Sequence, residues 1–231
     1  MILNQSWLTS TPIAHRGLHS ELIMENSLAA FDAAVADYYA IELDVHLSLD
    51  GEVVVFHDWT LNRLTQEEGK VSSKTIRELK ALSLPDGQQI PTLKEVLSLV
   101  DSRVPLLIEI KESRASNQIT EKVMDTLSKY KGDVAIQSFN PFIVSWVRLH
   151  HPNVMCGQLS GDWEQERFLE KIRNGWFNRF VNHLNKPSFI GFNVDLIEHY
   201  PVIDVPLLAW TVRDLEQHKK ADRYADNVIF E

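Results

Sequence analysis

The feature that most constrains the fold is an alternation that runs along nearly the whole chain. Short apolar runs rich in β-branched residues are followed by longer segments with helical periodicity. This is the pattern of parallel β/α units, in which each strand leads into a helix that covers the sheet. Strands are predicted at 12–15, 40–45, 53–57, 105–110, 134–138, 154–159, 189–194, 207–211 and 227–230. A β/α barrel needs eight strands, so one of these nine is surplus.

Helices are predicted between many of these strands. Asn26 is a candidate N-cap for the first of them. The segment between residues 45 and 53 is too short for a crossover helix, and Asp50-Gly51 is a strong turn signal. The strands at 40–45 and 53–57 therefore form either a hairpin or an irregular crossing, and either would explain the surplus. The predicted helices are 27–37, 93–100, 115–130, 141–150, 163–184 in two pieces, and 214–224.

The length of 231 residues fits one barrel domain, so a single domain over 1–231 is expected. Residues 59–91 are polar and lack a clear strand. We expect them to form a small insertion after the third strand, an excursion over the barrel mouth rather than a separate domain.

Composition narrows the possible partners. The net charge of −9 opposes attraction to nucleic acid and to anionic membranes, so a bound phosphate must be held by local groups. No apolar stretch is long enough for stable membrane insertion, and the amino terminus does not resemble a signal peptide, so a cytoplasmic location is expected. The single cysteine, Cys156, rules out an intramolecular disulfide and is interpreted as core filler.

Acidic residues collect at the ends of the predicted strands, where a barrel builds its active site. Glu42 and Asp44 are two apart in a strand, so both carboxylates point to one face, and Glu109 ends another strand. Burying three carboxylates together requires a cation, and a hard divalent ion, Mg²⁺ or Ca²⁺, suits oxygen ligands. The alternative is a buried salt-bridge network with Arg16 or Lys111.

Two histidines also lie at strand ends. His15 and His57 could divide general acid and general base work on a phosphodiester, because imidazole titrates near neutral pH. Arg16 and Lys111 would hold the nonbridging phosphate oxygens. The remaining seven histidines are interpreted as surface or structural residues.

Taken together, several ordered motifs resemble the glycerophosphodiester phosphodiesterase family, from residue 13 to about residue 212. They are His15-Arg16-Gly17, Glu25-Asn26-Ser27, Ile41-Glu42-Leu43-Asp44-Val45, Asp50-Gly51, Val54-Val55-Phe56-His57-Asp58, Ile108-Glu109-Ile110-Lys111, Ser138-Phe139 and Trp210-Thr211-Val212.

The resemblance implies a distorted TIM (β/α)8 barrel, one divalent cation, and cleavage of a small glycerophosphodiester into glycerol 3-phosphate and an alcohol. It also implies a route in which a glycerol hydroxyl attacks phosphorus and water opens the resulting cyclic phosphate. By similarity, the metal ligands are Glu42, Asp44 and Glu109, the acid-base pair is His15 and His57, and the phosphate contacts are Arg16 and Lys111.

Other matching positions are less direct. Glu25 and Asn26 match a further polar pair at the site, although Met24 replaces the usual proline. Residues 59–91 correspond to the family's insertion, which would shape the alcohol side of the pocket. At the carboxyl end Glu231 either substitutes for an acid of the family motif or is simply exposed. Apolar pocket walls or core packing are the two possible roles of Trp59, Phe139 and Trp210.

Two rival functions stay open. A phospholipase of a related barrel family would need an exposed apolar rim or a basic surface, which the acidic charge opposes. A noncatalytic phosphodiester-binding module would have no need of every matching position. The sequence does not choose the alcohol head group, the physiological metal or the oligomeric state.

Overall fold

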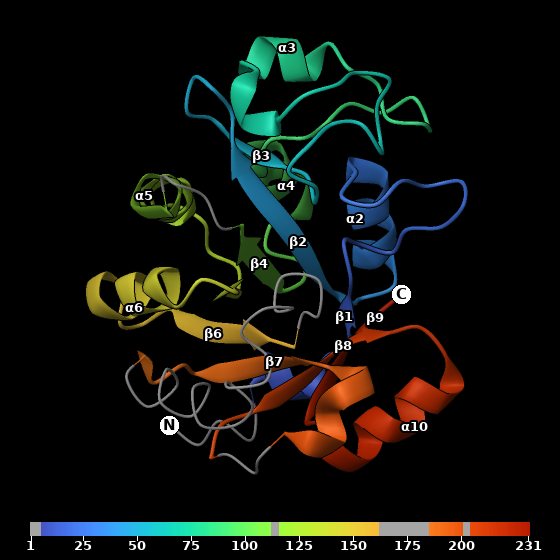
Figure 1. Ribbon diagram of the computed structural model, residues 1–231, viewed down its shortest axis with the longest axis vertical. Helices are drawn as coiled ribbons and strands as arrows, with labels where there is room; N and C mark the ends of the chain where they lie inside the picture. The colour runs from blue at the N-terminus through green and yellow to red at the C-terminus, as the bar shows by residue number, and fades with distance from the viewer. Residues whose placement is uncertain (1–5, 112–115, 162–184, 201–203) are drawn as a thin grey trace. The chain divides into compact units, whose positions relative to one another are not determined.

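The structure, a computed structural model, describes residues 6–111, 116–161, 185–200 and 204–231. Strands and helices alternate along it, as Figure 1 shows, so the chain is of the α/β class. It divides into two compact units, residues 14–134 and residues 1–13 with 135–231. Each unit is described by itself.

In the unit 14–134, the long strand β2 (Ala40–Leu47) pairs on both sides. It is parallel to β4 (Leu106–Ile110) and antiparallel to β3 (Val53–Val55). The turn between β2 and β3 contains Gly51 with φ +83°, a left-handed conformation that glycine adopts without strain. Residues 40–57 thus form a hairpin rather than an irregular crossing, and β3 is the surplus strand.

Helices α2 (Leu28–Ala36), α4 (Leu93–Val100) and α5 (Ser116–Leu127) lie close to three of the predicted ranges. The cap of α2 differs from the prediction: the Ser27 hydroxyl, not Asn26, accepts the Ala30 N–H. Asn26 cannot serve because its φ of +55° lies outside the extended range of a cap, and its side-chain amide donates to Asp44.

The insertion, residues 59–91, has no long strand but has a core. It contains the short helices η2 (Val71–Ser73) and α3 (Ile76–Lys80), and α3 begins with a capping box between Thr75 and Glu78. Its apolar side chains pack with those of β3 and the residue after it. The cluster is Val54, Phe56, Leu61, Leu64, Val71, Leu79, Leu84 and Ile90.

The second unit is a run of parallel strands with helices between them. Neighbouring strands pair in the order β5 (Val134–Ser138), β6 (Met155–Ser160), β7 (Phe189–Asn193), β8 (Leu207–Val212) and β9 (Asn227–Phe230).

The helices of this unit that the structure describes are α1 (Trp7–Ser10), α6 (Pro141–His150), η3 (Val194–His199) and α10 (Leu215–Tyr224). Cys156 is buried on β6, and burial raises the pKa of its thiol to about 11. The helix predicted at 163–184 in two pieces lies outside the described residues. Among the described helices, none is long and apolar enough to cross a membrane.

Candidate active site

Three carboxylates meet on the face that β2 and β4 share. Glu42 and Asp44 occupy alternate positions of β2, and the parallel register places Glu109 of β4 opposite Asp44. One oxygen from each carboxylate lies within 4.8 Å of the other two, and the three residues are 1, 1 and 7% exposed. This acidic triad could hold a metal ion.

Burial and mutual repulsion oppose ionisation of the three carboxyl groups, and their pKa values shift in different directions. Burial, followed by the charges of Asp44 and Glu109, raises the pKa of Glu42 well above its ordinary value. Burial also raises the pKa of Glu109. Burial opposes ionisation of Asp44 as well, but the charges of Lys111, His57 and Arg16 outweigh it and lower its pKa.

The two predicted phosphate-binding cations lie among these carboxylates. The Lys111 ammonium is 2.8 Å from both Asp44 Oδ1 and Glu109 Oε1, and Arg16 Nε is 3.6 Å from Asp44 Oδ2. These contacts are the salt-bridge network that the alternative interpretation requires. They do not bring the pKa of Glu42 down to its usual range, however, which leaves a reason for a further cation at the triad.

The loop after β1 (Ile13–Ala14) is bound to the triad by one backbone and one side-chain hydrogen bond. The Arg16 N–H donates to Glu42 Oε2 at 3.0 Å, and the Asn26 amide donates to Asp44 Oδ2 at 2.8 Å. Arg16 and Asn26 both have positive φ, and Gly17 follows with φ +80°. A Cβ on Gly17 would lie 2.8 Å from the Ala30 backbone, so only glycine fits there.

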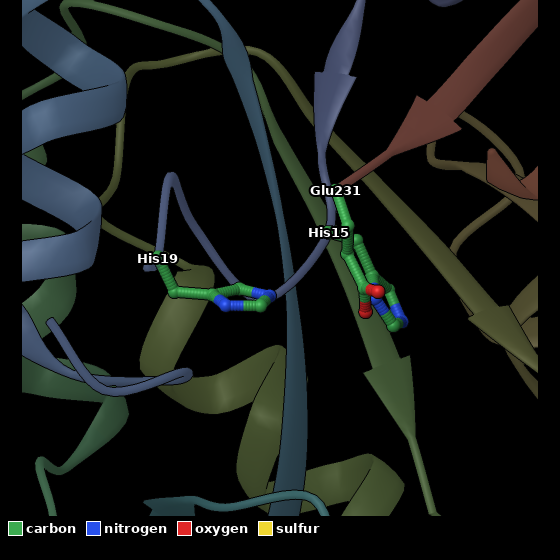
Figure 2. Close-up of side chains that lie close together, drawn as sticks. All are labelled: His15, His19 and Glu231. Carbon is green, nitrogen blue, oxygen red and sulfur yellow. The ribbon is translucent and has the colours of Figure 1, made fainter. Parts of the chain in front are cut away.

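The two histidines predicted to be catalytic lie just after the ends of β1 and β3. His15 directly follows β1, and Figure 2 shows its side chain and that of His19, which comes from the same loop. From the sequence, His19 is one of the seven histidines interpreted as surface or structural. His57 lies two residues after β3, and its Nδ1 is 2.6 Å from Asp58 Oδ1. Because the hydrogen bond with His57 and the contacts of Arg63 overcome burial and lower the pKa of Asp58, the carboxylate accepts and Nδ1–H donates.

His46, which the sequence predicts to be a surface or structural residue, is buried beside His57. Its Nε2 lies 3.1 Å from the His57 carbonyl, and its ring meets Trp59 edge-on at a centroid distance of 5.0 Å. Burial lowers the pKa of His46 to about 4. The neutral imidazole therefore donates Nε2–H to the carbonyl and holds the backbone of His57.

Two residues without a sequence-based role complete the site. Arg63 of the insertion donates to both Asp58 and Glu25, and Glu25 in turn accepts from Arg16 at 2.8 Å. A sequence signal existed for Asp58, which is part of a quoted motif. None existed for Arg63, because its partners lie in separate segments.

The profile of the Glycerophosphoryl diester phosphodiesterase family matches residues 15–230. This chain belongs to that family. A glycerophosphodiester phosphodiesterase of Caldanaerobacter subterraneus is 34% identical over 90% of this chain and 89% of its own length. The putative glycerophosphodiester phosphodiesterase YhdW of Bacillus subtilis is 37% identical over 87% of this chain and 86% of its own. Membership makes the chain an enzyme of the phosphoric diester hydrolase class.

Similarity to solved structures shows the fold of this chain. A Thermotoga maritima glycerophosphodiester phosphodiesterase matches with a TM-score of 0.74 at 29% identity, covering 95% of this chain and 94% of that one. An Oleispira antarctica phosphodiesterase in complex with its product sn-glycerol-3-phosphate matches with a TM-score of 0.80 at 23% identity, covering 95% and 92%. The fold is the TIM-like α/β barrel of eight parallel strands, as predicted, with β3 added to β2.

The remaining predicted site residues, all but one of them aromatic, lie in different surroundings. Trp59 is 45% exposed beside His46. Phe139 and Trp210 belong to the second unit, where their rings meet edge-on at 5.6 Å, so their part in the site stays a prediction. Glu231 is exposed and accepts from Arg213 Nε at 2.6 Å, so its substitution for the family's acid stays a prediction.

Proposed function

We propose that this chain hydrolyses glycerophosphodiesters to glycerol 3-phosphate and an alcohol, with one divalent cation at Glu42, Asp44 and Glu109. The buried acidic triad is the observation that carries the proposal. Support comes from the family match and from the Oleispira antarctica phosphodiesterase, which was solved in complex with the product sn-glycerol-3-phosphate.

The chemistry of the triad fits a hard cation. All three side chains offer carboxylate oxygens, which suit Mg²⁺ or Ca²⁺, and a bound dication would let Glu42 ionise despite its burial. Such an ion, when bound, supplies positive charge that stabilises the charge gathering on the phosphate oxygens.

The chain's own cations bind and orient the phosphate. Arg16 offers a planar fork of donors that matches two phosphate oxygens, and Lys111 offers a point charge. Burial opposes their ionisation, but the neighbouring carboxylates keep the pKa of both raised, so both stay charged. The substrate phosphate would share these cations with Asp44, Glu25 and Glu109.

The two histidines move the protons. One imidazole takes the proton of the glycerol hydroxyl next to the phosphoester as that oxygen attacks phosphorus, and the other protonates the departing alcohol oxygen. The resulting cyclic phosphate is opened by water with the roles reversed, which restores both imidazoles. Asp58 holds Nδ1–H of His57 and so leaves its Nε2 for this exchange.

The proposal is tested by release of glycerol 3-phosphate from glycerophosphocholine, glycerophosphoethanolamine and glycerophosphoinositol, with Mg²⁺, Ca²⁺ or chelator. We expect metal-dependent release from at least one of these diesters and little turnover of the matching lipid in vesicles. Faster turnover of the vesicle lipid would favour a phospholipase instead. Tight diester binding without product under any metal would favour a noncatalytic module.

The same assay tests the histidines. Replacing His15 or His57 by Ala should lower the rate by about 10² to 10⁴, the usual contribution of general acid-base catalysis. The exposed His218 is a matched control, and His218→Ala should turn over like wild type. An unchanged rate in His15→Ala or His57→Ala would remove that residue from the mechanism.

A further inference from the structure

Arg63 lies between two carboxylates from different segments of the unit 14–134. Its Nε and Nη2 donate to Asp58 Oδ2 and Oδ1 at 2.7 and 2.9 Å. Its Nη1 and Nη2 donate to Glu25 Oε2 and Oε1 at 2.8 and 2.6 Å. One planar guanidinium thus fixes both oxygens of two side chains, an arrangement a lysine cannot reproduce.

Each of these two carboxylates also accepts a hydrogen bond from a residue of the proposed mechanism. Asp58 Oδ1 lies 2.6 Å from His57 Nδ1, and Glu25 Oε1 accepts from Arg16 Nη1 at 2.8 Å. An unbroken chain of charge-assisted hydrogen bonds therefore runs from His57 through Arg63 to Arg16. It joins a proton-transfer group to a phosphate-binding group.

We propose that Arg63, a residue of the insertion, is a positioning residue that sets the orientation of His57 through Asp58 and of Arg16 through Glu25. The proposal rests on the proposed function, because it assigns Arg63 to that same site. It gives the insertion a part in turnover besides shaping the pocket: the insertion locks two segments of the site by one side chain.

A role in stability alone explains the contacts less well. The Arg63 side chain is 45% exposed, and exposed ion pairs contribute little to folding. The bidentate geometry on both partners instead fixes direction. Without Arg63, Asp58 can rotate about its side-chain torsions, and two nearby carboxylates lose the cation between them.

The test compares Arg63→Gln and Arg63→Lys with wild type in the glycerol 3-phosphate assay. Loss of a residue that orients a ligand or catalytic group typically reduces activity 10- to 100-fold, so we expect kcat to fall by about that factor in Arg63→Gln. KM should rise several-fold because Arg16 is loosened. Arg63→Lys should lose nearly as much. Metal affinity and melting temperature should stay close to wild type.

Arg77 of the same insertion provides the control. It is exposed on α3, and Arg77→Gln should match wild type in kcat and KM. Combining variants then separates the two branches. In an Asp58→Asn background the Arg63→Gln effect on kcat should shrink below about two-fold, and in a Glu25→Gln background its effect on KM should disappear.

An active Arg63→Gln enzyme within two-fold of wild type would overturn the proposal, as would a kcat loss that persists undiminished in the Asp58→Asn background. A failure of the proposed function looks different, since wild type itself would then release no product. In that case the nuclear magnetic resonance signal of the His57 Nδ1–H proton tests whether Arg63 positions His57. It should be protected in wild type and exchange-broadened in Arg63→Gln, and an unchanged signal would overturn the proposal.

Discussion

At the scale of single residues, the site contains two neighbouring carboxylates with opposite electrostatic character. The pKa of Glu42 is raised by burial and by the charges of Asp44 and Glu109, whereas that of Asp44 is lowered by Lys111, His57 and Arg16 against the effect of burial. In the metal-free protein, the surroundings therefore disfavour the ionised form of Glu42 and favour that of Asp44. The proposed ion would bind both residues as carboxylates.

This contrast predicts opposite effects on stability. Glu42→Gln should raise the melting temperature of the metal-free protein by a few degrees, equivalent to about 1 kcal/mol, because the neutral amide avoids both a buried charge and the cost of protonating the carboxylate. Asp44→Asn should lower it, because Lys111 and Arg16 lose a partner. Both variants should lose turnover and metal binding. Thermal unfolding with chelator measures the effect, and equal shifts of the same sign would contradict it.

His46 predicts a pH dependence of stability. Burial lowers its pKa to about 4 from an ordinary 6.5. The unfolded state thus binds a proton that the folded state refuses between these values, so stability is complete above about pH 6.5 and falls as the pH drops through this window. Between pH 7.5 and 5 this loss is about 2 kcal/mol.

The matched variant is His46→Gln, whose amide can donate to the His57 carbonyl without titrating. Urea unfolding at the two pH values should show a smaller loss for His46→Gln than for wild type, since the carboxylates contribute equally to both. Parallel losses would show that His46 does not stay neutral in the fold.

The acidic triad could be predicted from the sequence, whereas the contacts of Arg63 could not. The spacing of Glu42 and Asp44 fixes their shared face because strands have a period of two, and the register with β4 brings Glu109 alongside. The contacts of Arg63 could not be predicted, because Glu25 is 38 residues away in the chain and no local period relates the two.

At the scale of elements, the loop after β1 and the β2–β3 hairpin each depend on a glycine with positive φ. Gly17 and Gly51 have φ values of +80° and +83°, but only Gly17 is packed against a neighbour. A Cβ on Gly51 would meet nothing within 4 Å, whereas on Gly17 it would clash with the Ala30 backbone at 2.8 Å.

The pair makes a controlled comparison. Gly51→Ala should cost about 1 to 2 kcal/mol, from conformation alone, and leave kcat unchanged. Gly17→Ala should cost more and lower activity sharply, because the shift displaces the Arg16 N–H from Glu42. Denaturant unfolding and turnover of the two variants check this. Equal destabilisation with full activity in both would show that packing at Gly17 is unimportant.

Element prediction worked where periodicity is strong. The bounds of α4, α6, β5 and β9 match the predicted ranges, because each is a regular run with clear end signals. In the insertion the apolar residues are irregularly spaced, so α3 was not predicted, although Thr75-Ile76-Arg77-Glu78 carries a capping-box signature. The Asn26 cap was wrong because the side chain is engaged by Asp44.

At the scale of the whole molecule, the net charge of −9 opposes attraction to an anionic lipid surface. A negative chain that binds a negative substrate needs strong local cations. Arg16, Lys111 and the proposed divalent ion would supply them within a single site.

A calorimetric titration of Mg²⁺ and Ca²⁺ into chelator-stripped protein, with glycerol 3-phosphate release followed at each step, tests the proposed metal site. We expect one ion bound per chain, turnover that rises with occupancy of the site, and loss of both binding and turnover in Glu42→Gln. Full turnover by the stripped protein, or binding that survives in Glu42→Gln, would contradict this proposal.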